Sequence, residues 1–199
     1  MKNHSFIKFM EQQKGYASTK EILSKGAKFS QIEELLQEGR IERLKRGLYR
    51  LSTASISPIR EFVDLTKAVS KGVICLYSAL SHYGLTTFVP NQTMIAMPQG
   101  YHAPKLEQLS FQVFHFSQKQ YEAGMEIVQA PEGSYKIYTP EKSVCDAFRF
   151  RKKWGEDTAK EALFNYLEGK KKSLKKLLEM AEVCRMSKVM QPYIEARIG

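Results

Sequence analysis

The segment from Tyr16 to Leu51 constrains the fold of this chain more than any other part of its sequence. It reads YASTKEILSKGAKFSQIEELLQEGRIERLKRGLYRL. Ser18 and Thr19 are residue types that cap helix N-termini, and Glu21 follows at a position where the first turn favours an acid. Gly26 interrupts the helical pattern. A first short helix is therefore predicted between these points.

A second helix and a hairpin complete the segment. The helix is predicted to begin at Ser30, because Glu33 stands three residues later at the spacing of a capping box. Its apolar residues fall on one face, and Gly39 follows its end. The basic hairpin that comes next has a tight turn at Arg46 and Gly47, where glycine enters positive φ without steric cost.

Helix, turn, helix and basic hairpin in this order are typical of a winged helix-turn-helix. A short amphipathic helix fits the DNA major groove, and a hairpin rich in Lys and Arg lies over phosphates or the minor groove. Residues 5–13 predict one further short helix that packs under this unit. The sequence therefore predicts a DNA-binding domain at residues 1–52. The alternative is a structural hairpin whose arginines only keep an edge strand solvated.

Composition favours the same class of partner. The 199 residues carry a formal net charge of +10, which favours a polyanion such as nucleic acid. No apolar stretch approaches the ~18 residues of a membrane span, so a cytoplasmic protein without a membrane partner is expected. The three cysteines, Cys75, Cys145 and Cys184, are widely spaced and odd in number, which favours buried thiols over disulfides.

The remainder of the chain predicts a second domain. Ser52 to Ser57 is small and polar and is the best candidate linker, with Pro58 at a helix-starting position. Strands are predicted near residues 73–76, 93–97, 109–116, 125–129 and 135–138, and helices near 59–70, 78–83, 140–150, 158–167, 173–183 and 187–197. The predicted fold class is α+β (mixed): the winged helix-turn-helix, then residues 58–199 as a mixed α/β domain with a small sheet and C-terminal helices.

Catalytic patterns are weak in this sequence. The four histidines, His4, His82, His102 and His115, have no metal-binding spacing, and no nucleotide-binding glycine motif or hydrolase elbow occurs. Cys145 and Asp146 are adjacent, and neighbours on a helix do not face one another. We therefore expect Cys145 in the core and Asp146 as a structural hydrogen-bond acceptor. The sequence predicts no enzyme, no metal and no cofactor.

A second group of basic residues follows the predicted sheet. Its members are Arg149, Arg151, Lys152, Lys153, Lys170, Lys171, Lys172, Lys175 and Lys176. Such charge runs most often form a solvated face. The alternative is a second surface for nucleic acid or another acidic partner.

Three stretches of the sequence resemble a known family. LLQEGRIERLKRGLYRL, SALSHYGLT and YTPEKSVCDAFRFRKK are similar to the AbiEi family, the abortive-infection antitoxins of type IV toxin-antitoxin systems. The resemblance runs from about Tyr16 to Leu167. It implies a winged helix-turn-helix that represses its own operon by binding promoter repeats in double-stranded DNA. It also implies a later domain that counters a nucleotidyltransferase-like toxin without needing a stable complex with it.

By this resemblance the recognition helix falls on Ser30 to Glu38 and the wing region carries Arg40, Arg43, Lys45, Arg46 and Arg50. Because Glu33 and Glu34 face outward and are repelled by phosphates, base reading is expected from Ser30, Gln31 and Gln37. The wing is then expected to supply most of the affinity.

Two other functions stay open from the sequence. The first is a ligand-responsive winged-helix transcription factor, which would hold a small molecule in a pocket of its C-terminal domain. The second is a nuclease that uses the helix-turn-helix for targeting. A nuclease needs clustered carboxylates or a metal site, and the sequence shows neither pattern.

Overall fold

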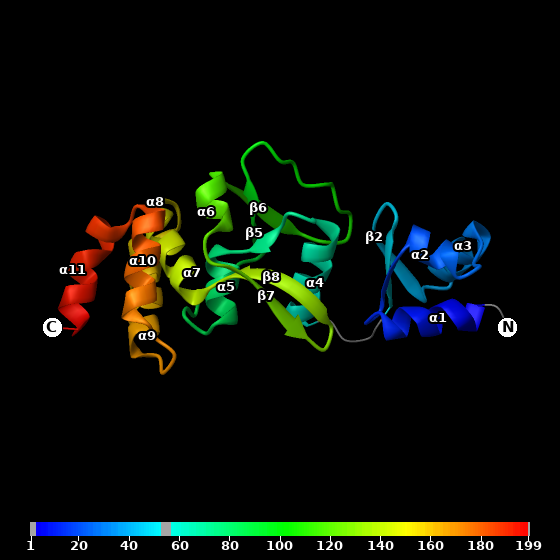
Figure 1. Ribbon diagram of the computed structural model, residues 1–199, viewed down its shortest axis with the longest axis horizontal. Coiled ribbons are helices and arrows are strands. Elements are labelled where there is room, and N and C mark those ends of the chain that lie inside the picture. Colours follow the sequence, from blue (N-terminus) through cyan, green and yellow to red (C-terminus); the bar gives the residue numbers. More distant parts are fainter. Residues whose placement is uncertain (1–2, 53–56, 199) are drawn as a thin grey trace. The chain divides into compact units, whose positions relative to one another are not determined.

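The computed structural model describes residues 3–52 and 57–198 and has the predicted mixed α+β fold (Figure 1). The predicted linker falls largely on residues 53–56, which lie outside the described residues. Contacts divide the chain into two compact units. The first comprises residues up to Ser70 together with Pro104–Ser110 and Gln129–Tyr135. The second comprises Lys71–Ala103, Phe111–Val128 and the chain from Lys136 onward.

The first unit opens with the predicted winged helix-turn-helix elements. They are α1 (Asn3–Gln12), β1 (Tyr16–Ser18), α2 (Thr19–Ser24), α3 (Phe29–Gln37), β2 (Ile41–Lys45) and β3 (Leu48–Leu51). The strands form an antiparallel sheet in the order β1-β3-β2. β1 was not predicted, because three residues are too short to show alternation. It pairs with β3 on the side opposite β2, and α2 follows it directly in the chain.

The start of α2 follows the sequence prediction. Ser18 is the N-cap, and its hydroxyl accepts a hydrogen bond from the Glu21 backbone N–H at 3.2 Å. The Glu21 carboxylate accepts in return from the Ser18 backbone N–H at 2.7 Å. These two reciprocal bonds make a capping box, which satisfies amides that the helix itself leaves unpaired.

The start of α3 corrects the prediction. The helix begins at Phe29 with Lys28 as N-cap, so Ser30 and Glu33 lie inside it and do not form a capping box. A lysine side chain has no hydrogen-bond acceptor, so Lys28 cannot cap the helix through its side chain. A side chain in the first turn of α3 bonds the Lys28 backbone instead. Gln31 accepts a hydrogen bond from the Lys28 backbone N–H at its Oε1, at 2.8 Å.

One apolar cluster holds these elements together. It joins Phe6 and Met10 of α1 to side chains of both following helices and of the sheet, among them Ile22, Leu35 and Tyr49. Its fully buried members all lie between residues 6 and 49. The next helix, α4 (Pro58–Ala68), has Pro58 at its first position, as predicted, and Ser57 as its N-cap.

A five-stranded sheet has the order β6-β5-β4-β8-β7. β4 pairs antiparallel with β5 and parallel with β8, and β5 pairs parallel with β6, so the sheet is mixed. Its strands are β4 (Val73–Ile74), β5 (Thr93–Pro98), β6 (Phe111–Phe116), β7 (Met125–Ala130) and β8 (Gly133–Tyr138).

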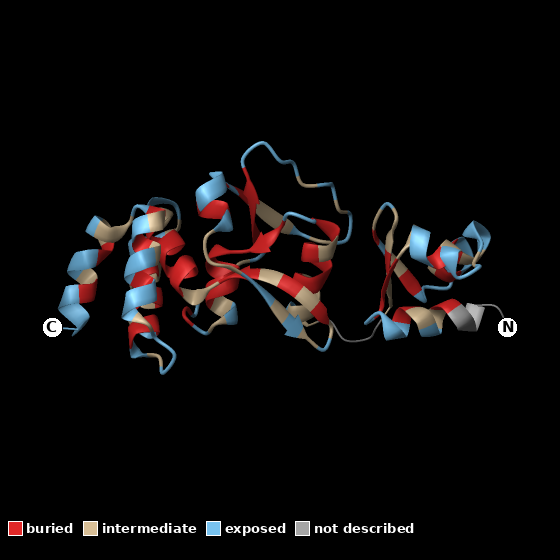
Figure 2. Cartoon of the chain, in the orientation of Figure 1, coloured by how far each residue is buried: buried red, intermediate tan, exposed pale blue. Residues whose placement is uncertain are grey.

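Helices surround and follow this sheet. They are α5 (Leu76–His82), α6 (Gln118–Glu122), α7 (Pro140–Arg149), α8 (Arg151–Trp154), α9 (Glu156–Glu168), α10 (Leu174–Cys184) and α11 (Ser187–Ile198). α7 packs against α5, α9 and α10 and is buried over most of its length (Figure 2). α6 and α8 were not predicted, because elements of one turn carry no helical periodicity.

Candidate nucleic-acid interface and a buried polar cluster

The outer face of α3 is the first part of the candidate interface. Ile32 and Leu35 point into the core, which leaves Ser30 and Gln37 exposed together with Glu33 and Glu34. A helix with one buried stripe and one exposed polar face can enter a DNA major groove. Base reading by Ser30 and Gln37 stays a prediction.

Gln31 has a structural role besides its predicted one. Its Oε1 holds the Lys28 backbone N–H at the start of α3. A glutamine that reads adenine uses its amide oxygen and nitrogen together. Gln37 is exposed at the other end of the helix, where its amide oxygen and nitrogen are accessible to a base. The role of Gln31 in base reading stays a prediction.

The hairpin β2–β3, residues Ile41 to Leu51, is the wing. Gly47 has φ +82° and forms the tight turn that the sequence predicts. Arg46 is exposed beside it, and Arg43 is exposed on β2, with its guanidinium 5.7 Å from the centre of the Tyr49 ring. These two arginines present positive charge on the outside of the wing.

The other basic residues of the wing region have partners within the chain. Arg50 binds the Glu42 carboxylate at 2.6 Å and also pairs with Asp64. Lys45 donates to the Ala68 carbonyl oxygen at 2.7 Å. Arg40, before β2, lies 3.7 Å from the Glu38 carboxylate and is exposed. DNA contacts by these three residues stay predictions.

Asp64 of α4 is the fully buried partner of Arg50. It also accepts a hydrogen bond from the Tyr16 hydroxyl at 2.8 Å. Burial raises the pKa of Asp64, and the Tyr16 hydrogen bond and the Arg50 charge oppose that rise. Burial also raises the pKa of Tyr16, with the Asp64 charge acting in the same direction. The arrangement makes Arg50 part of a buried polar network within the first unit.

Sequence reasoning missed three exposed lysines around the helix-turn-helix. They are Lys20, Lys25 and Lys28, on α2 and in the turn before α3. The sequence signal is the pair of lysines, Lys25 and Lys28, on either side of Gly26 in the turn between the two helices. Phe29, at the start of α3, is also 62% exposed.

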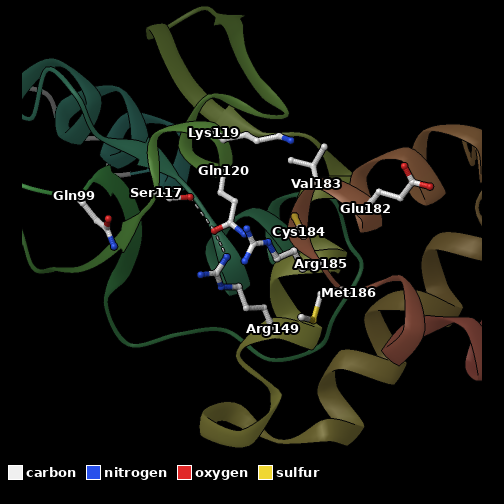
Figure 3. A pocket seen from close by; sticks show the side chains of 10 residues that line it. All are labelled: Gln99, Ser117, Lys119, Gln120, Arg149, Glu182, Val183, Cys184, Arg185 and Met186. Carbon is white, nitrogen blue, oxygen red and sulfur yellow. Dashed lines mark hydrogen bonds between the residues drawn. The ribbon is translucent and has the colours of Figure 1, made fainter.

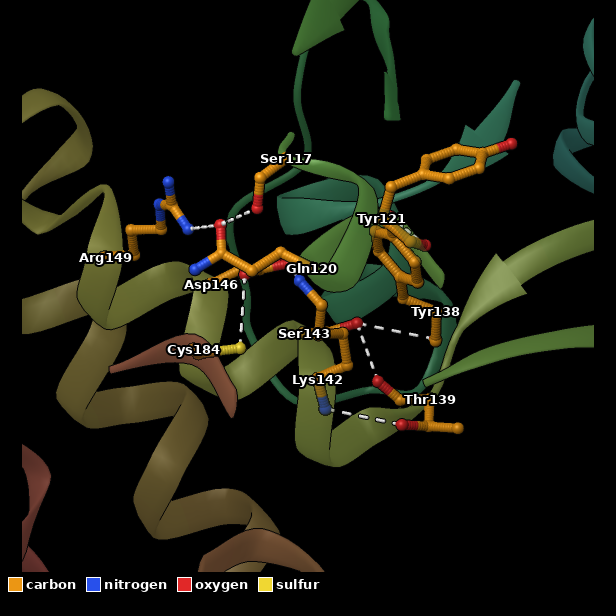
Figure 4. Close-up of polar contacts among 10 residues, drawn as sticks. All are labelled: Ser117, Gln120, Tyr121, Tyr138, Thr139, Lys142, Ser143, Asp146, Arg149 and Cys184. Atoms are coloured by element: carbon orange, nitrogen blue, oxygen red, sulfur yellow. Dashed lines mark hydrogen bonds and ion pairs between the residues drawn. The ribbon is translucent and has the colours of Figure 1, made fainter. Parts of the chain in front are cut away.

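The T-P-E-K-S-V-C-D segment at residues 139–146 forms a buried polar cluster (Figure 4). Thr139 caps α7, and Lys142 pairs with Asp146 at 2.5 Å with both side chains fully buried. The Cys184 thiol donates to the other carboxylate oxygen of Asp146 at 3.8 Å. Cys145 is also fully buried. The predictions of a core Cys145 and of Asp146 as a structural acceptor are confirmed.

The predicted second basic surface divides into two kinds of residue. Arg149 and Arg151 are half-buried, and they donate to the Gln120 side chain and to the Phe148 carbonyl oxygen. The exposed members are Lys152, Lys153, Lys170, Lys171, Lys172, Lys175 and Lys176. Whether this surface meets nucleic acid stays a prediction.

The described residues contain neither a metal-binding cluster nor a membrane-spanning helix. Within residues 3–52 and 57–198, no group of three His, Cys, Asp or Glu side chains could hold a metal ion. In the same residues, no helix is both long and apolar enough to cross a membrane.

Comparisons with known proteins support the family resemblance at the N-terminus. Residues 7–52 match the family model described as "Transcriptional regulator, AbiEi antitoxin". This match confirms the resemblance over the winged helix-turn-helix and supports a DNA-binding, regulatory function. Similarity to this family beyond residue 52 stays a prediction.

Other comparisons concern the whole chain. No curated protein matches it. Among solved structures, the RV2827C protein from Mycobacterium tuberculosis superposes with a TM-score of 0.55 at 13% sequence identity. The alignment covers 100% of this chain and 82% of that one, which shows a shared fold.

Proposed function

We propose that this protein is an antitoxin that represses its own operon by binding promoter repeats. In this proposal α3 and the wing bind DNA, and the residues after the predicted linker counter a nucleotidyltransferase-like toxin. The observation that carries the proposal is the exposed polar face of α3 beside the exposed Arg43 and Arg46, within the segment that matches the regulator family.

The wing and α3 contribute differently to DNA binding in this proposal. Arg43 and Arg46 attract phosphates, and each phosphate contact makes the negative slope of log K against log salt steeper by about 0.9. The outward carboxylates of Glu33 and Glu34 limit how much affinity α3 itself can supply. α3 therefore contributes specificity, through Gln37 and Ser30, and the wing contributes most of the affinity. The exposed Lys25 and Lys28 add positive charge at the start of α3.

The protein acts by binding in this proposal and performs no catalytic step. Repression lowers the amount of toxin made, and the later domain counters toxin that has already been made. Both actions take place in the cytoplasm, where the operon and its products are.

A test in cells separates the two actions with the full-length chain. A reporter under the promoter upstream of the gene measures repression, and growth during co-expression of the neighbouring toxin from an unrelated promoter measures protection. The variant is Gln37→Ala, and the matched control is Gln108→Ala, an exposed glutamine outside the helices and strands.

The variant should lose repression and keep protection, whereas the control should keep both. A bidentate base contact by Gln37 predicts a loss of about 1–3 kcal/mol on the promoter repeat. If Gln37→Ala represses the reporter fully, Gln37 does not contact a base. If the wild-type protein neither represses the reporter nor protects against the toxin, the proposed function is wrong.

A further inference from the structure

A cavity of about 510 Å³ lies in the second unit, away from the residues assigned to DNA (Figure 3). Its wall is formed by α6, by the end of α7, and by the turn after α10. Cavities of this size hold small molecules in many proteins. The lining has more cationic than anionic side chains, because it includes Lys119, Arg149 and Arg185 and a single carboxylate, Glu182.

Two guanidinium groups converge in this cavity. Figure 3 shows the side chains of Arg149 and Arg185 pointing toward the amide of Gln120, while Glu182 points away from them. Among the described residues neither arginine forms a salt bridge. Two like charges that share one hollow repel each other, and a bound anion would remove that repulsion.

The buried polar cluster holds one of these arginines in place. Asp146 and Arg149 are three residues apart on α7 and lie on neighbouring positions of the same face. Asp146 is held in place by its ion pair with Lys142, one turn earlier on α7. Arg149 donates to the Oε1 of Gln120, which also accepts from the Ser117 hydroxyl at 3.3 Å.

The backbone places the second arginine. Cys184 ends α10 and donates its thiol to Asp146. Arg185 follows in the left-handed region with φ +58°, a conformation that is uncommon for a residue with a side chain. That conformation ends α10 and, as Figure 3 shows, directs the side chain of Arg185 toward the cavity. Both arginines are therefore positioned by the same core of α7 and α10.

We infer that this cavity binds a small molecule that carries a phosphate group, with Arg149 and Arg185 pairing with the phosphate oxygens. Planar guanidinium groups match the geometry of phosphate oxygens and bind them in pairs. The hollow shape favours a compact ligand over the backbone of a DNA duplex, which needs an open surface. The volume leaves room for a group about the size of a nucleoside beside the phosphate.

The test measures binding of inorganic pyrophosphate to the full-length protein by calorimetry at constant ionic strength. Wild-type protein should bind it saturably. Arg185→Gln should weaken that binding at least tenfold, and Arg149→Gln should weaken it similarly. Lys105→Gln removes an exposed charge that lies outside the cavity lining and outside both predicted basic surfaces, and this variant should bind like the wild type.

The outcome is decisive even if one variant folds poorly. Arg185 is exposed and forms no salt bridge among the described residues, so Arg185→Gln should unfold at the same temperature as the wild type. Unchanged pyrophosphate affinity in folded Arg185→Gln would overturn the inference, as would absence of saturable binding to the wild type. Displacement of pyrophosphate by duplex DNA from this site would also overturn it, since the cavity would then belong to a nucleic-acid surface.

Discussion

Lys142 is a charged residue in the core of the protein. Its side chain is fully buried, its Nζ lies 2.5 Å from Asp146, and the ring centres of Phe116 and Tyr138 are each 4.6 Å from it. Burial raises the pKa of Asp146, and the Lys142 charge and hydrogen bond oppose that rise. The sequence placed Lys142 on a helix, and it could not show the burial, because the Phe116 ring that lies against its ammonium group comes from a distant part of the chain.

Replacing Lys142 with methionine should destabilise the protein strongly. The substitution keeps much of the side-chain volume and leaves the Asp146 carboxylate buried without its cation. Breaking a buried ion pair in this way costs about 3–5 kcal/mol. The free energy of unfolding in urea measures the effect, with Lys176→Met as a control on an exposed face of α10.

The double variant Lys142→Met with Asp146→Leu tests the reason for that loss. It removes both charges and should recover part of the stability lost in the single variant. If Lys142→Met lowers the free energy of unfolding by less than about 1 kcal/mol, the buried Asp146 carboxyl group does not depend on the Lys142 charge.

At the scale of elements, the sequence predicted helices well where a cap or a proline stood at the start. Ser18 caps α2, Pro58 begins α4, and Thr139 caps α7 with Pro140 at its first position, all as expected. The start of α3 was misplaced because Lys28 cannot cap a helix through its side chain. Gln31 caps it from inside the first turn, and a pattern that begins from the N-cap residue does not detect this.

The candidate site was predictable in part. Gly47 and the basic residues around it identified the wing, because turn glycines and charge runs are visible in the sequence. Which arginines have partners was not visible, since Arg50 pairs with Glu42 across the hairpin and with Asp64 beyond residue 56. The close approach of Arg149 and Arg185 depends on how α7 and α10 pack, which no local pattern contains.

The capping box of α2 predicts a pH dependence. The Ser18 hydroxyl and backbone N–H, which bond the Glu21 carboxylate, lower its pKa from the ordinary value of 4.5. A folded-state pKa below the unfolded one means that the stabilisation is present above about pH 4.5. It is then lost as the pH falls through the folded-state pKa.

The difference in unfolding free energy between wild type and Glu21→Gln should therefore shrink as the pH is lowered from 7 to 3. Thermal unfolding across that range measures it. In a Ser18→Ala background the effect of Glu21→Gln should be smaller, because the hydroxyl bond is gone and only the bond from the residue 18 backbone N–H remains. A difference that stays constant with pH would contradict the assignment of Ser18 as the partner.

At the scale of the whole molecule, the sequence predicted the fold class and most elements. It did not predict the sheet order β6-β5-β4-β8-β7, because pairing between distant strands leaves no mark in a single sequence. It also placed a domain boundary at residues 52–58, whereas the first compact unit includes α4 and two later segments. The predicted boundary therefore stays a prediction that fragments can test.

A fragment of residues 1–57 should fold and bind DNA. The apolar cluster of the helix-turn-helix is drawn entirely from this part of the chain. Without α4, Arg50 keeps Glu42 as a partner and loses Asp64, so the fragment should be less stable than the intact protein. Circular dichroism and DNA titration measure both properties. An unfolded fragment would place the boundary of the DNA-binding domain after α4.

The central claim is that the wing binds duplex DNA through phosphate contacts. The most direct measurement is the salt dependence of binding to the DNA upstream of the gene, for wild type and for Arg43→Ala with Arg46→Ala. Loss of two phosphate contacts should weaken binding and make the slope of log K against log salt shallower by about 1.8. The control, Lys105→Ala with Lys188→Ala, removes two exposed charges elsewhere and should leave the slope close to that of the wild type. A wing variant that binds with the wild-type slope would contradict the claim.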